Sequence, residues 1–359
     1  ITRGPSYPPT TFQDDNAGAQ MNPLTSAAGV IGAHRDGNTG TPSINVPATP
    51  LYTVQKLISN DSASAERELW LRRQFMRNLV YCNTGMLMPD EKGKVNVTDV
   101  ESLSQCLQAE SPDEVSLIIA AAEHCGVLLT ARNAHYIECK GLEKYIDMQR
   151  RNGDKESNND EAARSNYGGP SETVELLAVN EFDSDRKMMS VLVRYTDTDL
   201  PDGKSTGKGT QSSRIVLLCK GADSSMLRNC IHDATPYTSV CMSHIDAFAN
   251  IGLRTLVAAC RTVPEEEAQK WLASYKDAAN SLVDRAEMLT KCAREIEKDM
   301  ILLGAIGIED ELQDGVPESI STLHAADINV WMITGDKAET AVAIGKKCNL
   351  IDMERQQVE

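Results

Sequence analysis

Alternating hydrophobic and polar positions between residues 175 and 195 predict a β-hairpin near the middle of the chain. Two apolar segments flank a short charged turn there, and a period of two is typical of strands with one buried face. A polar loop then leads to another alternating segment, residues 214–219. This segment is expected to lie antiparallel to the strand before the loop. The pattern therefore predicts a mainly antiparallel sheet.

Apolar residues at helical spacing predict helices before and after this sheet. The folded part is expected to begin near Ala65 with one such helix. A second helix has signals at both ends, because Ser111 and Glu114 form a capping box and Gly126 supplies the C-cap. A third is expected to end at Gly252. One long helix is expected from Pro264, with an inner face made of Trp271, Leu272, Tyr275, Leu282, Leu289 and Ile296.

The pattern changes after Met300. Residues 300–310 and 329–333 are apolar with little alternation, and a helical segment lies between them. Continuous apolar strands that alternate with helices indicate a parallel sheet. The second segment runs directly into residues 334–337 and another helix, and the carboxyl end of such a strand is where open α/β sheets bind ligands. A partial second domain of parallel α/β type is therefore expected.

Composition excludes several classes of protein. A formal net charge of −16 argues against nucleic acid and anionic membrane surfaces as partners of the chain. The 10 cysteines form no Cys-x-x-Cys pair, so they indicate reduced core thiols and neither a disulfide framework nor a zinc site. No apolar run approaches the roughly 18 residues of a membrane span. Residues 1–51 are low in complexity and expected to be poorly ordered, and the chain looks like a piece of a longer protein.

Four places in the sequence suggest anion or nucleotide chemistry, and each also has a structural interpretation. Phe182 and Lys187 in the central turn would suit a base and a phosphate, or would be a buried aromatic beside a solvated strand end. Lys220 with Gly221 suits close approach to an anion, or a strand-ending turn. Arg254 either pairs with an acid or reaches a phosphate. Glu114 holds a ligand or only caps its helix.

Six motifs occur in an order that resembles the cytosolic part of the type-IV P-type ATPases, the phospholipid flippases. The motifs are QAESPDE at 108–114, EFDSDRKMMSV at 181–191, KGAD at 220–223, GLRTL at 252–256, IEDELQDGVPE at 308–318 and TGDKAETA at 334–341. The resemblance extends from about residue 65 to residue 351. The sequences SPDE and IEDELQDGVPE distinguish this subclass from the cation pumps, which differ at those positions.

The resemblance implies a role for each matching residue. Phe182 corresponds to the aromatic that stacks on adenine, and Lys187 to a lysine near the nucleotide. Lys220, with Gly221 beside it, corresponds to the lysine of the base pocket. Glu114 corresponds to an acid near the adenine, and Arg254 to an arginine that reaches the phosphates.

The remaining implied site residues lie near the C-terminus. Thr334, Gly335 and Asp336 correspond to the TGD loop of the phosphorylation domain, which meets the γ-phosphate. Asp310 corresponds to an acid on the ribose side. The implied class is α/β: residues 52–300 form a nucleotide-binding domain with a mainly antiparallel sheet, and residues 301–359 form part of a haloacid-dehalogenase-like phosphorylation domain.

The resemblance also implies a function for the intact protein. ATP, with Mg²⁺, would phosphorylate an aspartate and drive phospholipid between leaflets, with membrane helices and a possible accessory subunit supplied from outside this sequence. The Asp-Lys-Thr-Gly-Thr and Gly-Asp-Gly motifs are absent, so no catalytic residue or metal site is expected here. The chain is expected at the cytosolic face of a membrane, binding ATP without turnover and binding no nucleic acid.

Two other functions remain open from the sequence. One is a stand-alone nucleotide-binding or regulatory module. The other is a soluble phosphatase of the haloacid-dehalogenase type, which would use its own aspartate. The phosphatase requires an Asp-x-Asp motif after an apolar strand near the start of the chain, and the sequence has none there.

Overall fold

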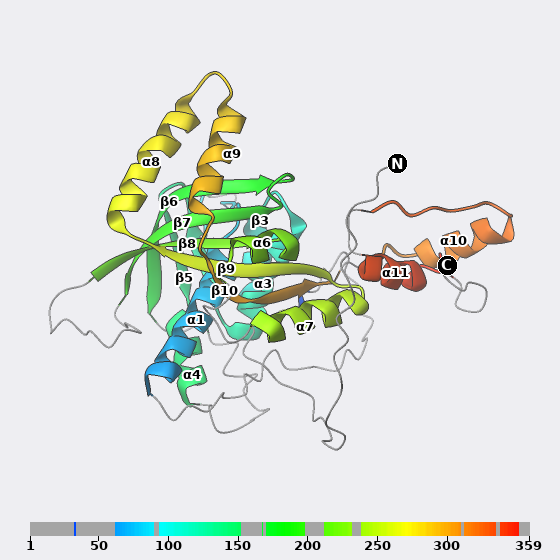
Figure 1. The fold of residues 1–359 in the computed structure, drawn as a ribbon. Coiled ribbons are helices and arrows are strands. Elements are labelled where there is room, and N and C mark those ends of the chain that lie inside the picture. The colour runs from blue at the N-terminus through cyan, green and yellow to red at the C-terminus, as the bar shows by residue number, and fades with distance from the viewer. Residues whose placement is uncertain are drawn as a thin grey trace, which may run out of the picture.

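The structure is a computed structural model that describes residues 32–33, 62–89, 93–151, 167, 170–197, 212–231, 238–309, 312–334 and 338–351. Its main element is an eight-stranded sheet with the strand order β1-β10-β9-β8-β7-β6-β5-β4 (Figure 1). The strands are β1 (Gly32–Ala33), β4 (Leu128–Arg132), β5 (Tyr136–Lys140), β6 (Ser171–Asp183), β7 (Met188–Asp197), β8 (Ser212–Gly221), β9 (Arg254–Val263) and β10 (Ile301–Ile308). A separate short pair joins β2 (Met86–Leu87) to β3 (Leu107–Gln108).

The pairing confirms the predicted mainly antiparallel sheet. β6, β7 and β8 form two successive hairpins, and Val191 of β7 lies between Val179 of β6 and Leu218 of β8. Among the described strands only β1 pairs in parallel, with β10, and an isolated parallel bridge joins Cys230 to Met300. Two residues of the low-complexity start, Gly32 and Ala33, therefore extend the sheet, and the rest of residues 1–51 lies outside the described residues.

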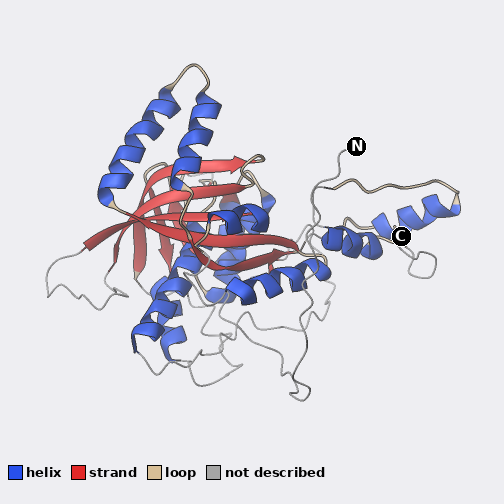
Figure 2. Cartoon of the chain, in the orientation of Figure 1, coloured by secondary structure: helices blue, strands red, loops and turns tan. Residues whose placement is uncertain are grey.

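Helices cover both faces of the sheet, so the alternation of the strands creates two cores (Figure 2). Val191 and Val193 face the core beneath α1 (Ser62–Tyr81), α2 (Val100–Cys106), α3 (Pro112–Cys125) and α4 (Leu142–Arg151). Leu192 faces the core beneath α6 (Asp223–Asn229), α7 (Thr238–Asn250), α8 (Glu265–Asn280) and α9 (Arg285–Ile296). Among the described helices none is long and apolar enough to cross a membrane.

The single long helix predicted after Pro264 is wrong. The chain forms α8 and α9, which project from the sheet as an antiparallel hairpin (Figure 1). The break follows Ser281, and Asp284 adopts a left-handed backbone conformation with φ 54°. Leu282, predicted on the inner face, is fully exposed at the tip. The apolar residues keep helical spacing across the turn between α8 and α9, so their spacing gives no sign of the turn.

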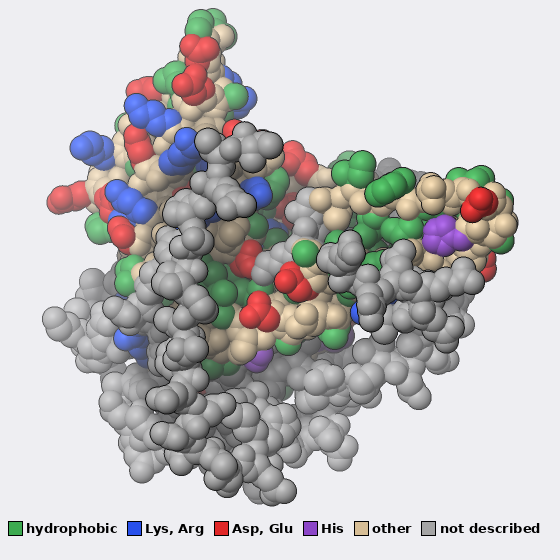
Figure 3. Space-filling view, turned by 45° about the vertical axis from the view of Figure 1, so that its right-hand side comes forward, with side chains coloured by type: hydrophobic (Ala, Val, Ile, Leu, Met, Phe, Trp, Pro, Cys, Tyr) green, Lys and Arg blue, Asp and Glu red, His purple; other side chains and the backbone are tan. Residues whose placement is uncertain are grey.

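The two apolar segments of the C-terminal region also differ from their prediction. β10 lies antiparallel to β9 and continues the main sheet, so it is not a strand of a parallel sheet. Residues 329–333 form no strand in the described structure, and Trp331 and Ile333 are 85% and 98% exposed. They lie between the helices α10 (Val316–Ala325) and α11 (Ala338–Lys347) on a segment whose surface is largely hydrophobic (Figure 3). An apolar segment in the sequence suggests a buried strand. In the structure such a segment forms a buried strand only where a neighbouring strand pairs with it.

Candidate functional site

The turn between β6 and β7 presents an exposed aromatic ring beside a lysine. Phe182 is 61% exposed, so the interpretation as a buried phenylalanine is wrong. The Asp183 carboxylate orders the turn, because it accepts hydrogen bonds from the amides of Asp185 (2.7 Å) and Arg186 (3.3 Å). Lys187 has φ 54°, a conformation that costs a residue with a side chain about 1–2 kcal/mol. The turn therefore holds a lysine in a strained backbone conformation, and an exposed phenylalanine lies near the end of β6, just before the turn.

Sheet register brings Lys187, Gly221 and Lys220 to the same end of the sheet. Met188 pairs with Gly221, and the Ala222 amide donates to the Lys187 carbonyl at 2.9 Å. A Cβ atom on Gly221 would lie 2.5 Å from that carbonyl oxygen. Close packing of two strands therefore requires glycine at position 221, whether or not an anion approaches it.

Lys220 is a buried cation with incomplete partners. Its side chain is 6% exposed, and Nζ makes no hydrogen bond to any described residue. The closest acid is Glu114, with Oε1 3.9 Å from Nζ. Burial lowers the pKa of Lys220 below its usual value, and the nearby charges of Cys82, Glu114 and Asp113 oppose this shift. An unsatisfied buried ammonium is costly, so this position calls for an acceptor from outside the described residues.

Glu114 is buried in the first turn of α3. Ser111 is the N-cap as predicted, and its Oγ accepts from the Asp113 amide at 3.2 Å. The predicted capping box is wrong, because the Glu114 carboxylate instead accepts from the amide and hydroxyl of Thr84, at 2.9 and 2.6 Å. Glu114 thus fixes the segment after α1 and faces Lys220, as a ligand-holding interpretation requires.

Arg254 heads β9 and pairs with an acid. Its Nη1 donates to both carboxylate oxygens of Asp113, at 3.0 and 2.8 Å. The pairing interpretation is therefore confirmed. The Arg254 side chain is still 38% exposed, which leaves part of the guanidinium accessible. Asp113 was missed from the sequence, although it stands beside Glu114 in the SPDE motif.

Arg132 was also missed, and a single arginine at the end of a strand gives no local signal. It donates to the Asn83 Oδ1 at 2.8 Å and the Tyr81 carbonyl at 3.1 Å. Burial lowers the pKa of Arg132 to about 10, and the charge of Glu114 opposes the shift. Arg132 therefore orders the segment that carries Thr84, and Thr84 in turn orients Glu114.

The structure places six of the ten predicted site residues in one connected group. The connected group comprises Phe182, Lys187, Lys220, Gly221, Glu114 and Arg254. Asp310, Gly335 and Asp336 lie outside the described residues. Thr334 is exposed and directly follows Ile333. The described residues contain no cluster of His, Cys, Asp or Glu that would hold a metal ion.

This geometry fits an adenine nucleotide in two respects. An exposed aromatic ring offers a stacking surface, and base stacking on aromatic rings is common in nucleotide recognition. A buried ammonium without a hydrogen-bond acceptor offers a partner for a polar or anionic ligand. Both features lie at one end of the strands β6, β7 and β8.

The chain is similar in sequence to several phospholipid-transporting ATPases. The chain is 39% identical over 282 residues to phospholipid-transporting ATPase C887.12 of Schizosaccharomyces pombe. These 282 residues are 79% of this chain and 18% of that protein. It is 43% identical over 183 residues to phospholipid-transporting ATPase DRS2 of Saccharomyces cerevisiae, 51% of this chain and 12% of that protein. For phospholipid-transporting ATPase IC of Homo sapiens the identity is 36% over 279 residues, 78% and 18% of the two chains.

The chain thus spans less than one fifth of the length of these relatives, by shares of 18%, 12% and 18%. Residues 72–315 match the family described as P-type ATPase, cytoplasmic domain N. That match covers more than half of the sequence. The chain therefore belongs to the P-type ATPases, and residues 72–315 correspond to their cytoplasmic N domain.

Proposed function

We propose that this chain binds ATP at the end of the sheet formed by β6, β7 and β8. The observation that carries the proposal is the Lys220 ammonium, which is buried and has no hydrogen-bond acceptor among the described residues. Phe182 supports it, because a phenylalanine that is 61% exposed at a strand end serves no core.

Each residue of the group has a role in this proposal. Phe182 stacks on the adenine, and Lys220 with Glu114 forms the polar wall of the base pocket. Lys187 and Arg254 meet phosphate charge, while Gly221 lets β7 and β8 approach closely. For the remaining phosphate and ribose contacts the proposed residues are Thr334, Gly335, Asp336 and Asp310.

For the longer protein we propose ATP-driven phospholipid translocation. The support is the set of relatives, whose names describe them as phospholipid-transporting ATPases. ATP supplies the phosphoryl group, and Mg²⁺ would shield its charge during in-line transfer to an aspartate outside this sequence. Residues 52–300 would be the nucleotide-binding domain at the cytosolic side, and residues 301–359 part of the phosphorylation domain. A membrane region and a possible accessory subunit would contact the phospholipid.

Substitution of Phe182 by alanine tests the base pocket. We expect ATP affinity to fall by about 1–3 kcal/mol, which is the usual contribution of one stacked base. Calorimetric titration of the purified chain with ATP measures this change. Phe182→Trp should retain most of the affinity, because the larger ring also stacks.

The control is Ser111→Ala, which removes a helix cap and no proposed ligand contact. It should cost about 1 kcal/mol of folding free energy and leave ATP affinity unchanged. If Phe182→Ala binds ATP as well as the unchanged chain and keeps its circular dichroism spectrum, the stacking assignment is wrong.

The pH dependence of ATP binding tests Lys220. Its lowered pKa means that the free protein loses this charge at a lower pH than an ordinary lysine does. A hydrogen-bond acceptor on the bound base favours the ammonium form, so above that pKa binding requires proton uptake. Affinity should then fall as pH rises, by up to about tenfold per pH unit from this single group.

Lys220→Arg provides the comparison, because a guanidinium keeps its charge throughout. Its absolute affinity will differ, but the decline between neutral and alkaline pH should be shallower than in the unchanged chain. Arg254→Gln should lower affinity and keep the original slope, since Arg254 is charged at every pH used. Parallel slopes for all three proteins would remove Lys220 from the site.

A further inference from the structure

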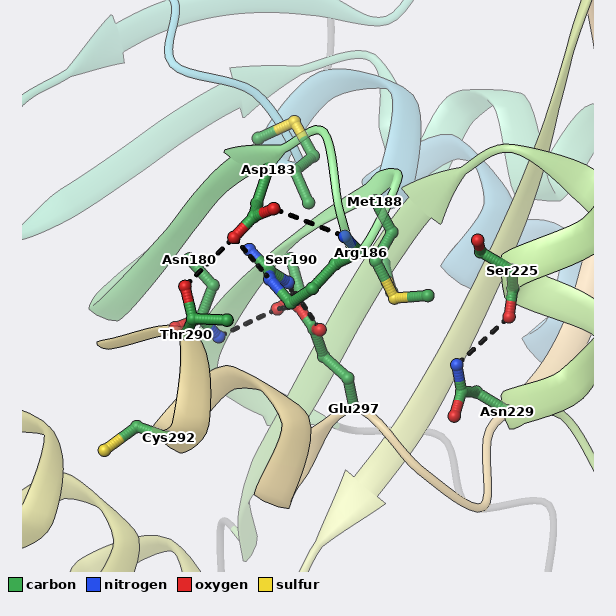
Figure 4. Close-up of polar contacts among 12 residues, drawn as sticks. Asn180, Asp183, Arg186, Met188, Ser190, Ser225, Asn229, Thr290, Cys292 and Glu297 are labelled. Carbon is green, nitrogen blue, oxygen red and sulfur yellow. Dashed lines mark hydrogen bonds and ion pairs between the residues drawn. The ribbon is translucent and has the colours of Figure 1, made fainter. Parts of the chain in front are cut away.

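The buried network beneath the β6–β7 turn has no place among the proposed ligand contacts. Its centre is an ion pair between Arg186, in the turn, and Glu297, which directly follows α9 (Figure 4). The side chains are 5% and 2% exposed. Arg186 Nη1 donates to both carboxylate oxygens of Glu297, at 2.6 and 2.5 Å. Two residues 111 positions apart in the sequence are therefore held together in the interior.

The network reaches both strands that flank the turn. The Ser190 hydroxyl on β7 donates to Glu297 Oε1 at 2.8 Å, and the Asn180 amide on β6 donates to Ser190 Oγ at 2.9 Å. Asn180 and Ser190 are also direct partners in the sheet register. The Glu297 carboxylate thus contacts β7 directly through Ser190. It is linked to β6 indirectly, because Asn180 bonds to the same Ser190 hydroxyl.

Arg186 also fixes the backbone next to the proposed stacking residue. Its Nη2 donates to the Glu181 carbonyl at 2.7 Å, and Glu181 immediately precedes Phe182. A second contact from α9 acts on the same turn, because the Thr290 hydroxyl donates to Asp183 at 2.9 Å (Figure 4). Phe182 therefore lies between the Glu181 carbonyl, which Arg186 holds, and Asp183, whose carboxylate Thr290 holds.

This arrangement matters because the ring itself has little packing. Phe182 is 61% exposed, so the backbone of the turn determines where its ring and the neighbouring Lys187 lie. A buried ion pair adds little net stability compared with apolar side chains of similar volume, and its best-attested value is in fixing a geometry. A turn that is ordered before binding also avoids the entropic cost of ordering it on binding.

From these contacts we infer that Arg186 and Glu297 are positioning residues for the nucleotide site. They act through the turn and touch no ligand. The inference rests on the proposed ATP site, and it assigns to the end of α9 the task of orienting Phe182 and Lys187.

The test compares Glu297→Gln with Glu172→Gln in the full chain. Both replace an arginine-paired carboxylate that is largely shielded from solvent, 2% exposed in Glu297 and 15% in Glu172. Glu172, however, lies near the start of β6 and Phe182 near its end. The Glu297→Gln chain should bind ATP about two- to tenfold more weakly, which corresponds to ordering one side chain on binding. Glu172→Gln should bind ATP normally at temperatures where it is folded. Phe182→Ala should cost less affinity in the Glu297→Gln chain than alone, because the two residues act on one contact.

A second measurement separates failure of this inference from failure of the proposed ATP site. The Lys187 amide donates to the Asp183 carbonyl at 2.6 Å, so its hydrogen exchange reports the order of the turn without any nucleotide. Faster exchange in Glu297→Gln, but not in Glu172→Gln, would support the positioning role even if ATP fails to bind. Unchanged exchange together with unchanged ATP affinity would overturn it.

A double variant covers the case in which Glu297→Gln does not fold. Arg186→Met combined with Glu297→Leu replaces the pair by apolar side chains and should remain folded. It removes the bond to the Glu181 carbonyl, so we expect weaker ATP binding and faster exchange of the Lys187 amide. Normal values for both would show that the pair only fills the core.

Discussion

Replacing Arg77 by alanine is expected to cost about 3–5 kcal/mol of folding free energy, because it leaves a largely buried carboxylate without its cation. Arg77 lies on α1 with its side chain 2% exposed, and it forms an ion pair with Glu172 of β6. Its guanidinium also lies 3.8 Å from the ring centroid of Tyr195. These contacts fasten α1 to two strands, and a loss of this size is a large part of the about 5–15 kcal/mol that stabilises a typical domain.

Chemical denaturation of Arg77→Ala and Arg194→Ala measures the difference. Arg194 pairs with Glu175 and Glu265 on the surface, where its side chain is 29% exposed, so its removal should cost at most about 1 kcal/mol. Equal losses in the two variants would contradict the buried-pair argument.

The same pair predicts a pH effect with a definite sign. Burial alone would raise the pKa of Glu172, but the charge and hydrogen bonds of Arg77, with a bond from Tyr81, lower it overall. A lowered folded-state pKa stabilises the protein above the unfolded value of about 4.3. That contribution is lost as pH falls through the folded-state pKa. In Arg77→Ala the contribution should be missing already at neutral pH.

The central sheet was predictable because its strands are apolar and adjacent in sequence. β7 has one core on each face, yet its turn residues and the polar loop after it still marked both hairpins. Helix ends were predictable where a single residue determines them, as at Ser111 and Gly126. Leu282 was misplaced because spacing alone does not show where a helix stops. Residues 329–333 were misplaced because apolar composition does not supply a partner strand.

The proposed site was predictable only as far as local motifs and family resemblance reach. Phe182, Lys187 and Lys220 each stand in a short distinctive motif. Asp113 and Glu297 were not identified as partners, because their arginines lie 141 and 111 positions away in the sequence. Pairings over such distances leave no periodic signal in one sequence. They appear only when the sheet places β9 beside α3 and the end of α9 beneath the β6–β7 turn.

Gly221→Ala is expected to weaken both the fold and the proposed site. The new Cβ would lie 2.5 Å from the Lys187 carbonyl oxygen and 2.5 Å from the Met188 Cβ, so β7 must move away from β8. That shift would break the bond from the Ala222 amide to Lys187, which measures 2.9 Å. Overpacking and one lost hydrogen bond together should cost about 2–4 kcal/mol of folding free energy.

ATP affinity should fall as well, because the displaced atoms belong to the turn that carries Lys187 and adjoin Lys220. Gly307→Ala is the matched control in the same sheet, since its Cβ would meet Leu253 Cδ1 at 2.8 Å and Phe248 Cγ at 3.2 Å. The closest atom is a leucine methyl that can rotate away, and no backbone atom is involved, so a smaller loss of stability and unchanged ATP affinity are expected. Denaturation and calorimetry on both variants measure the two effects. If Gly221→Ala loses stability but binds ATP normally while folded, Gly221 serves strand packing alone and the proposed site lies away from the β7–β8 end.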